Sequence, residues 1–558
     1  MPQQEATVPV DSLVTVACEG RNVSTIEIDT RRPRFSGPMA IWRRAARTIG
    51  LHNTETQEVV VRRFLSLEEG RPCTEFRRAE SERLLRAQPF LATASVRTLD
   101  DGAGGVLVKV ETIDEVPALV AARYRGGDWA LGLGNDNIFG SGTRVIVRAE
   151  QRAFYRDGIG AAVEHRQVFG RPYVLTLDGM RHPRGERYVA ELGHAFRTDL
   201  QRFAWHTGYS HRKDYMRLRS DDGDATLTLP LRQVTWDAGG IVRIGPPGRT
   251  FLGGGVLTGE RVLPAPATVL VTDTGFAPAP AADADAGDQY AAARSVRANA
   301  VGGLRVIRYR SARGVDALTG QQDLANGVQL GLVVGRSIPR VSRDNDAFIG
   351  AHLFAGMGSE RSYGAFQLDG EARRAFDGPR DWDAILGSGR AAWYFKPARV
   401  FTSIASVEWA GGWRARFPAM LELGDREGGV RGFGDADMAG ARRGVVRLEE
   451  RWIAGPVRGR GDLGFAVFGD AGKVWAGDAP FGVTTPVAAS VGLSVLAAVP
   501  VGGQRLYRAD VAFPVRGPGR GVEVRFSAND PTRAFWTTPD DIMRARAAAI
   551  PQRVFAWP

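Results

Sequence analysis

A single arginine, Arg431, lies in a glycine-rich stretch, GGVRGFGDADMAG, over residues 428–440. Its guanidinium could contact a phosphate, lie exposed in a turn, or enter a cavity and pair with a carboxylate. The two extended segments that follow carry suitable carboxylates, Glu449 in GVVRLEERWI and Asp470 in GFAVFGDAGKVW. A guanidinium bonds two oxygens at once through its planar fork, whereas an ammonium group is a point charge. If the polar faces of these segments line a lumen, Arg431 on an inward loop can reach both carboxylates.

Patterns typical of enzymes are weak in this sequence. His206 and His211 are five residues apart, so a continuous strand would place them on opposite faces, which is unsuitable for a shared metal ion. Ser141 lies in FGSGT without the strand-to-helix turn of a nucleophile elbow. Phosphate-loop and dinucleotide-binding patterns are absent from the sequence. We therefore expect no enzymatic activity, no catalytic residue, no metal site and no cofactor.

The two cysteines, Cys18 and Cys73, both lie in the first hundred residues. They could form a disulfide in an oxidising compartment or remain two reduced thiols, and no metal-ligand spacing surrounds them. The sequence leaves both alternatives open.

The N-terminal part of the chain predicts one small α/β domain over residues 23–115, after an N-terminal extension over residues 1–22. An alternating run at 23–29 predicts a strand, and two helical segments are predicted at 41–50 and 56–67. A third helix, TEFRRAESERLLRAQ, has Thr74 as its expected cap, and alternating runs at 90–99 and 105–114 follow it. The order is strand, helices, strand, strand, with a basic helical surface.

After this domain, alternating segments separated by turn signals continue from residue 117 to 527. One face of each segment is aromatic or apolar and the other is small or charged, as in the outward sets Phe203, Trp205, Thr207 and Tyr209, or Phe401, Ala405, Val407 and Trp409. Charged side chains facing a wet lumen and aromatics facing outward are typical of a transmembrane β-barrel. The fold class we predict is therefore an all-β transmembrane barrel behind the α/β domain. A propeller or a set of sandwiches is the alternative.

Composition favours this class over others. The net charge of +11 would suit nucleic acid, but the 73 basic residues are spread along the chain instead of forming a patch, so we expect no nucleic-acid partner. The most apolar run, residues 487–499, is too short to span a bilayer as a helix, which takes about 20 residues. No secretion signal is recognisable at the N-terminus. Residues 528–558 form a C-terminal extension beyond the last expected strand.

The ordered motifs of the chain resemble the BamA/TamA superfamily of outer-membrane assembly and secretion barrels. The resemblance is carried by NDNIFGSGTRV (135–145), VRGF (430–433), LEER, FGDAG and the closing segment GVEVRFS (521–527). Residues 23–115 resemble a single POTRA domain, enlarged by an insertion at 31–53. The resemblance implies a barrel of about sixteen antiparallel strands, with a seam between residues 118–125 and 521–527. It also implies an inward loop held by Val430, Arg431, Gly432 and Phe433 against Glu449 and Asp470.

The same resemblance implies a location in the bacterial outer membrane, with the N-terminal domain in the periplasm. The expected partners are the lipid bilayer, unfolded outer-membrane or secreted protein clients, and periplasmic or lipoprotein accessory subunits. The expected function is insertion of outer-membrane proteins or translocation of a protein substrate. A passive pore or structural barrel without a protein client is the alternative.

Overall fold

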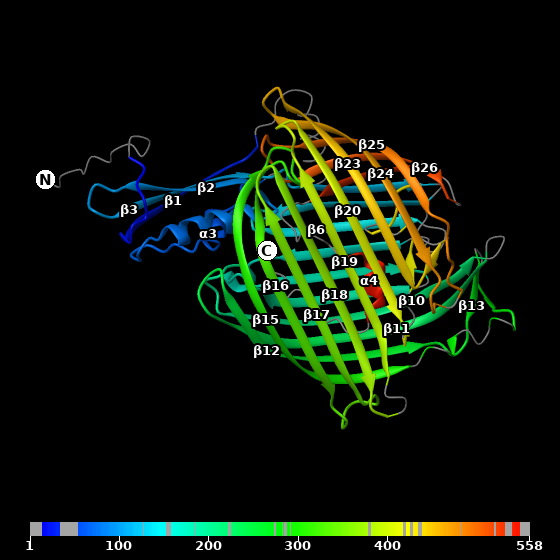
Figure 1. Cartoon of the computed structure of the whole chain (residues 1–558). Coiled ribbons are helices and arrows are strands. Elements are labelled where there is room, and N and C mark those ends of the chain that lie inside the picture. Colours follow the sequence, from blue (N-terminus) through cyan, green and yellow to red (C-terminus); the bar gives the residue numbers. More distant parts are fainter. Residues whose placement is uncertain are drawn as a thin grey trace.

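A small α/β domain and a large β-barrel make up the computed structural model (Figure 1). The structure describes residues 14–33, 54–125, 128–151, 158–183, 185–220, 225–272, 275–281, 283, 287–288, 290, 292–377, 381–416, 420–424, 428–433, 438–479, 481–517, 521–529 and 538–546. The helix expected at 41–50, most of the insertion expected at 31–53, and parts of both terminal extensions lie outside these residues. No helix among the described residues has the length and apolar character needed to cross a membrane.

The small domain is a three-stranded sheet with two helices. Its strands are β1 (Val23–Arg31), β2 (Leu91–Asp100) and β3 (Val106–Asp114), and the sheet order is β1-β3-β2. Strand β1 runs parallel to β3, and β2 runs antiparallel to it. The helices are α2 (Glu58–Arg62) and α3 (Glu75–Arg86). The α3 helix begins as expected, because the Thr74 side chain accepts a hydrogen bond from the backbone N–H of Arg77.

The core of this domain includes a disulfide. Cys18 and Cys73 are bonded, with their Cα atoms 5.0 Å apart, and both are fully buried. Aliphatic residues of β1, β2, β3 and both helices pack around them, including Val61, Leu85 and Val108. The structure thus selects the disulfide from the two alternatives that the sequence left open. The bond ties the segment before β1 to the start of α3.

Twenty strands of the described chain form a closed antiparallel barrel. The first six are β4 (Ala118–Arg125), β5 (Asp128–Ile138), β6 (Thr143–Gln151), β7 (Gly158–His165), β8 (Val174–His182) and β9 (Gly185–His194). The next nine are β10 (Phe203–Ser220), β11 (Thr226–Ile244), β12 (Thr250–Pro264), β15 (Ala293–Arg313), β16 (Gln321–Ser337), β17 (Asp346–Gly358), β18 (Ser362–Ala375), β19 (Trp382–Phe395) and β20 (Phe401–Trp413). The last five are β23 (Arg442–Val457), β24 (Gly461–Trp475), β25 (Ala488–Ala498), β26 (Leu506–Arg516) and β27 (Glu523–Asn529).

Short elements lie beside this ring. The hairpin of β13 (Val269–Thr272) and β14 (Gly275–Pro278) extends from the barrel between β12 and β15, which pair directly with each other. Strands β21 (Leu421–Glu422) and β22 (Ala439–Gly440) pair only with one another, between β20 and β23. A short turn of 3₁₀ helix, η2 (Val168–Gly170), joins β7 to β8, and helix α4 (Asp540–Ala545) follows the last strand.

The expected number of about sixteen strands is wrong, because the ring has twenty. That number came from the resemblance, whose motifs fix the order of a few segments and do not count the strands between them. The connections here are often short, such as the one from Gly358 to Ser362, so the same length of chain accommodates additional strands. The all-β barrel class itself is confirmed.

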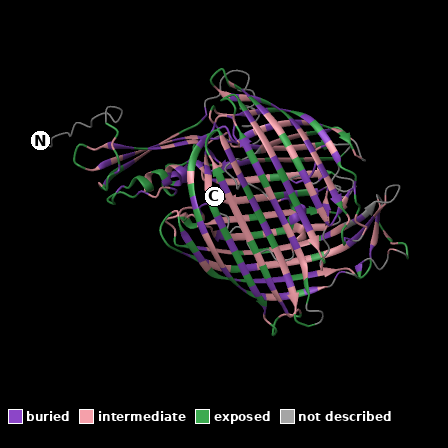
Figure 2. Cartoon of the chain, viewed as in Figure 1, coloured by how far each residue is buried: buried purple, intermediate pink, exposed green. Residues whose placement is uncertain are grey.

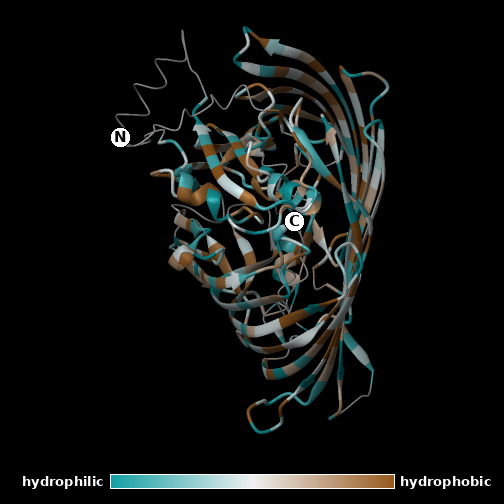
Figure 3. Cartoon of the chain, turned by 90° about the vertical axis from the view of Figure 1, so that its left-hand side faces the viewer, coloured by the Kyte–Doolittle hydropathy of each residue, from teal (hydrophilic) through white to brown (hydrophobic). Residues whose placement is uncertain are grey.

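The alternation of the strands has the expected direction. Side chains such as Phe203, Tyr209, Val407 and Trp409 are exposed on the outer face, whereas their neighbours Ala204, Ser406 and Glu408 are buried. Figure 2 shows this alternation of exposed and buried residues along the strands, and Figure 3 shows the matching alternation of hydropathy. Because much of the outer face is apolar over a closed ring, the barrel has a surface that suits the lipid of a bilayer.

The small domain is fixed to one end of the barrel by buried arginines of α3. Arg86 makes two hydrogen bonds of 2.9 and 3.0 Å to Asp323 on β16, and the guanidinium of Arg83 lies 4.3 Å from the ring centre of Tyr309 on β15. The helical surface that appeared basic in the sequence is therefore partly an internal contact. At the same junction, Thr56 bonds both Asp114 and Asn137, and burial raises the pKa of the Asp114 carboxyl to about 6.

The ring closes between its first and last strands, β4 and β27, as expected. Among the described residues, three pairs form this seam: Tyr124 with Val524, Arg123 with Arg525 and Ala122 with Phe526. Strands β10 and β11, by contrast, pair along most of their length. The seam is therefore a short ladder in an otherwise extensively paired barrel.

This register predicts a specific crosslink. Tyr124 and Val524 are directly opposite and both are exposed on the outer face, so Tyr124→Cys with Val524→Cys will form a disulfide on mild oxidation. Peptide mass mapping under non-reducing conditions measures its yield. Tyr124→Cys with Phe526→Cys, which is two residues out of register, is the matched control. A higher yield for the control would show that the seam has a different register.

Candidate functional site

The chain between β20 and β23, residues 414–441, is named the inward connection. Its described residues place the glycine-rich stretch against the inner wall of the barrel. The backbone N–H of Val430 donates to the carbonyl of Leu423 at 2.7 Å, which holds the stretch beside the β21–β22 pair. Phe433 is fully buried in an apolar cluster with Val430, Met438 and residues of β23, β24 and β25. Val430 and Phe433 thus anchor the connection by apolar packing on both sides of Arg431.

Arg431 is paired mainly with Asp470 on β24. Its Nε and Nη2 atoms lie 2.6 and 2.7 Å from the two carboxylate oxygens, and its backbone N–H donates to the same carboxylate at 3.3 Å. The guanidinium carbon also lies 3.4 Å from the ring centre of Phe468, two residues earlier on the strand. This bidentate pair over an aromatic face is a geometry that a lysine could not reproduce.

Glu449 on β23 contributes less to Arg431 than the sequence suggests. The nearest oxygen of Glu449 is 3.8 Å from Nη1 of Arg431. The same carboxylate accepts a 2.6 Å bond from Arg451 and two bonds of 2.9 and 2.8 Å from Arg508 on β26. Glu449 is therefore shared by three arginines, and it links Arg431 of the inward connection to β23 and to Arg508 on β26.

A residue not singled out from the sequence, Glu523, completes the site. The backbone N–H of Gly432 donates to Glu523 Oε2 at 2.6 Å, and Glu523 Oε1 accepts a 3.1 Å bond from Arg123. Glu523 begins β27 and Arg123 belongs to β4, so one carboxylate joins the glycine-rich stretch to both strands of the seam. Gly432 has φ +87°, and a Cβ there would meet Pro514 at 3.0 Å, so a glycine is needed for this approach.

The sequence contained a weak signal for Glu523. In GVEVRFS, Glu523 and Arg525 share one face of the last strand, opposite Val524 and Phe526. The alternation therefore directs Glu523 towards the lumen. Nothing in that pattern indicates its partners, because Gly432 and Arg123 lie 91 and 400 residues away in the chain.

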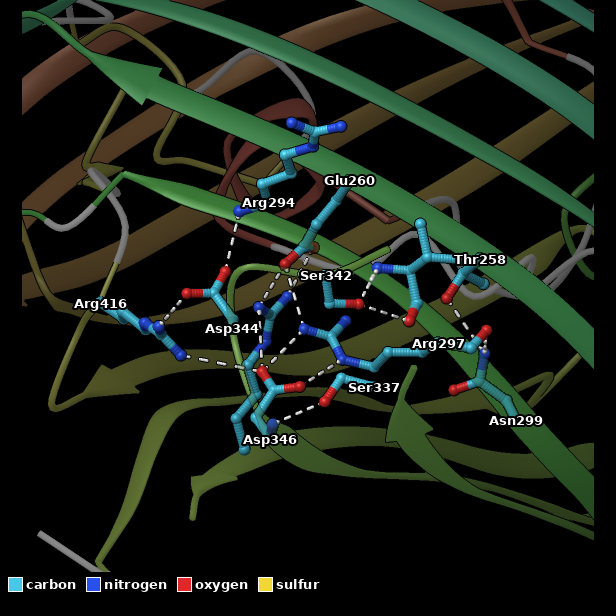
Figure 4. A network of polar contacts seen from close by, with 12 residues as sticks. Thr258, Glu260, Arg294, Arg297, Asn299, Ser337, Ser342, Asp344, Asp346 and Arg416 are labelled. Carbon is cyan, nitrogen blue, oxygen red and sulfur yellow. Dashed lines mark hydrogen bonds and ion pairs between the residues drawn. The ribbon is translucent and has the colours of Figure 1, made fainter. Parts of the chain in front are cut away.

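A second ionic cluster holds the start of the same connection to the opposite group of strands (Figure 4). Arg416, just after β20, lies 2.9 Å from Asp344 and 3.7 Å from Asp346. Asp346 makes two further bonds of 2.9 Å to Arg297, and Glu260 bonds both Arg297 and Arg373. The connection is thus attached at Arg416 as well as at Arg431.

The C-terminal extension also enters the barrel. Helix α4 lies inside the ring in Figure 1, where Asp541 is buried against Arg443 on β23 and accepts a 3.0 Å bond from the backbone N–H of Glu422. Ile542 packs with Leu386, Ala410 and Leu421. The last strand, β27, ends at Asn529 opposite Leu506, at the small-domain end of the barrel. Helix α4 lies beside the inward connection.

The arrangement holds segments of the polypeptide by ion pairs and hydrogen bonds. Among the described residues, no group of three or more His, Cys, Asp or Glu side chains could hold a metal ion. The buried carboxylates Asp470, Glu449 and Glu523 are each bonded to at least one arginine. The site therefore fixes segments inside the lumen and at the seam.

Comparisons with known proteins give remote structural likenesses. No family model matches the chain and no curated protein matches its sequence. The chain is similar to BamA from Haemophilus ducreyi lacking POTRA domains 1–3, at 13% identity and a TM-score of 0.36, over 91% of this chain and 85% of that one. It is similar to CdiB from Escherichia coli, at 11% identity and a TM-score of 0.46, over 92% and 77%. It is also similar to Pseudomonas aeruginosa OpdK with vanillate, at 14% identity and a TM-score of 0.31, over 74% and 96%. At these values the likenesses assign neither a family nor an activity.

The contacts of Glu523 predict a large stability effect. In Glu523→Gln, Arg123 and Arg525 lose their opposite charge, and loss of one partner of a buried pair costs about 3–5 kcal/mol. We expect the variant to lose its folded, fast-migrating form at a clearly lower temperature in a heat-modifiability assay. Glu450→Gln on the outer face, where one hydroxyl of Ser403 is the bonded partner, is the control. Equal melting of both variants would contradict the assigned role.

The contacts of α4 predict a conductance effect. Asp541→Asn removes the charge that faces Arg443, so the C-terminal segment will occupy the lumen less often and single-channel conductance in planar bilayers will rise. Asp540→Asn alters the neighbouring residue, which is exposed, and should leave conductance at the wild-type value. Unchanged conductance in Asp541→Asn would mean that the segment does not limit ion flow.

Proposed function

We propose that this protein is a bacterial outer-membrane barrel that assists insertion of outer-membrane proteins or translocation of a protein substrate. In this proposal the inward connection, anchored through Arg431, controls the seam. The observation that carries it is the bonding of Glu523 to Gly432 on the connection and to Arg123 on the first strand. A displacement of the inward connection at Gly432 would therefore alter the contacts of Glu523 at the seam between β4 and β27.

The outer surface supports a membrane location. Aromatic and aliphatic side chains are exposed around the ring, including Trp393, Val407, Leu448 and Leu493, and such a surface is stable only against lipid or a protein partner. The small domain would then project from one membrane face, which we assign to the periplasm. We assign to it the role of a single POTRA-like domain that meets clients or accessory subunits.

The seam supports a role in handling extended chains. In the described part of the chain three residue pairs hold β4 to β27, so few backbone hydrogen bonds between these residues oppose their separation. Separated edges would present unpaired N–H and C=O groups, which template the addition of another strand. A client strand could pair there while the barrel remains otherwise intact.

The small domain has an edge that already binds an extended segment. The backbone N–H of Val16 donates to the carbonyl of Thr98 on β2, and the N–H of Asp100 donates to the carbonyl of Val14, both at 3.0 Å. Strand β2 is the edge of its sheet, so this contact is strand addition by the protein's own N-terminal segment. It supports uptake of client strands by the same edge.

A passive pore is the alternative, and the occupied lumen counts against it. The inward connection and α4 both lie within the ring and are bonded to its wall at Asp470, Arg443 and Asp346. A pore that conducts freely has no need for two bonded segments in its lumen. We propose no catalytic chemistry, no cofactor and no nucleic-acid partner for this barrel.

The proposal is tested by the folding rate of a urea-denatured outer-membrane barrel into liposomes that contain this protein. We expect the wild type to accelerate folding and Arg431→Ala to lose the acceleration, because Asp470 is left without its bidentate partner. Arg148→Ala, which breaks a 2.6 Å lumen contact with Asp178 on strands away from the connection, is the control and should retain acceleration.

The same folding experiment is repeated with the seam between β4 and β27 crosslinked. Oxidised Tyr124→Cys with Val524→Cys should lose the acceleration, and reduction should restore it. If wild-type protein that is correctly inserted gives no acceleration, insertion of that client is excluded. Large, steady conductance that does not depend on Arg431 would instead support the passive pore.

A further inference from the structure

Four exposed cations lie side by side on the outer face of β10, β11, β12 and β15. Lys213 is directly opposite Arg232, and Arg261 is directly opposite Arg294. Arg232 faces Leu263, two residues from Arg261, so the two pairs are diagonal neighbours. We name Lys213, Arg232, Arg261 and Arg294 the cation row. Like charges directly opposite on neighbouring strands repel one another, so the row is unfavourable unless an anion lies against it.

The cation row has no counter-charge within the described part of the chain. None of the four side chains has a carboxylate within 4.0 Å. Glu186 is opposite Lys213 on β9, but it lies 3.5 Å from His211 instead. Asp344 bonds the backbone N–H of Arg294 and the side chain of Arg416, and Figure 4 shows the Arg294 guanidinium directed away from that cluster.

The position of the row relates it to the membrane boundary. Along β11 the outward residues run from Ile244 and Val242, through Trp236, to Arg232, so an apolar stretch and an aromatic residue precede the cation. Ile244 lies at the small-domain end, and Arg232 lies towards the opposite end. Aromatic residues concentrate at the interfaces of membrane barrels. The row therefore lies at the headgroup level of the leaflet remote from the small domain.

We propose that the cation row binds the phosphates of a bis-phosphorylated glycolipid of the lipid A type, in the leaflet remote from the small domain. Adjacent strands are about 4.8 Å apart, so four cations on four strands extend over roughly 14 Å. That length exceeds one phosphate group and suits two phosphates at opposite ends of a disaccharide. Three arginines supply planar donors that bond phosphate oxygens in pairs.

The inference uses the proposed outer-membrane location but requires no client, so lipid binding and client folding can fail independently. Native mass spectrometry of the full chain in detergent, titrated with diphosphoryl lipid A, measures the affinity. Arg261→Gln with Arg294→Gln should weaken binding by about 25-fold, because each cation near a charged lipid surface contributes about fivefold.

The matched control is Arg308→Gln with Arg310→Gln. These two arginines are exposed on the outer face of the same strand, β15, near the small-domain end, so the charge change is identical and the position differs. The control should bind diphosphoryl lipid A within twofold of wild type. Lys213→Gln with Arg232→Gln provides a second test of the row if the first variant does not fold.

Two further lipids identify the source of the phosphate. Monophosphoryl lipid A should bind wild type more weakly than diphosphoryl lipid A, and phosphatidylglycerol should bind more weakly still and respond little to the variants. Equal binding of phosphatidylglycerol, with equal losses in Arg261→Gln with Arg294→Gln, would overturn the glycolipid assignment in favour of a general anionic surface. Unchanged lipid A binding in both row variants would overturn the site.

Discussion

One carboxylate, that of Glu523, joins the two strands at the ladder where the ring closes. Every strand of a closed sheet must satisfy its backbone groups on both sides, and between β4 and β27 the described residues do so over three pairs. Glu523 adds side-chain bonds at this point, to Arg123 across the seam and to Gly432 on the inward connection. Closure of the ring is therefore linked to the position of the inward connection through Glu523.

The lumen is organised by the same kind of contact throughout. Arg431 with Asp470, Arg416 with Asp344, and Arg443 with Asp541 each attach an internal segment to the wall. Buried ion pairs contribute little net stability, because desolvation opposes their attraction, but a stranded partner is strongly unfavourable. Such contacts specify one arrangement of the internal segments more than they stabilise the barrel.

The two surfaces of the barrel place arginine in different roles. Inside, arginines such as Arg508 are bonded to carboxylates, in this case Glu449, and join one part of the chain to another. On the outer face, Arg232, Arg261 and Arg294 stand beside other cations, and their complement has to come from outside the chain. The net charge of +11 is a sum over the whole sequence and does not distinguish these two settings.

The sequence by itself determined the local features of this protein. Period-two alternation gave the strands and their inward and outward faces, Thr74 gave the start of α3, and the spacing of Arg431, Glu449 and Asp470 gave residues that meet in the lumen. Only the tertiary structure decided the twenty-strand ring and the Cys18–Cys73 disulfide. It also decided the hydrogen bonds from Arg508 to Glu449 and the position of α4 inside the barrel. The physical reason is the distance along the chain between the residues involved. Alternation and capping depend on residues close together in the sequence. Strand number and ion pairing depend instead on register and closure, which bring together residues such as Arg123 and Glu523 from opposite ends of the barrel sequence.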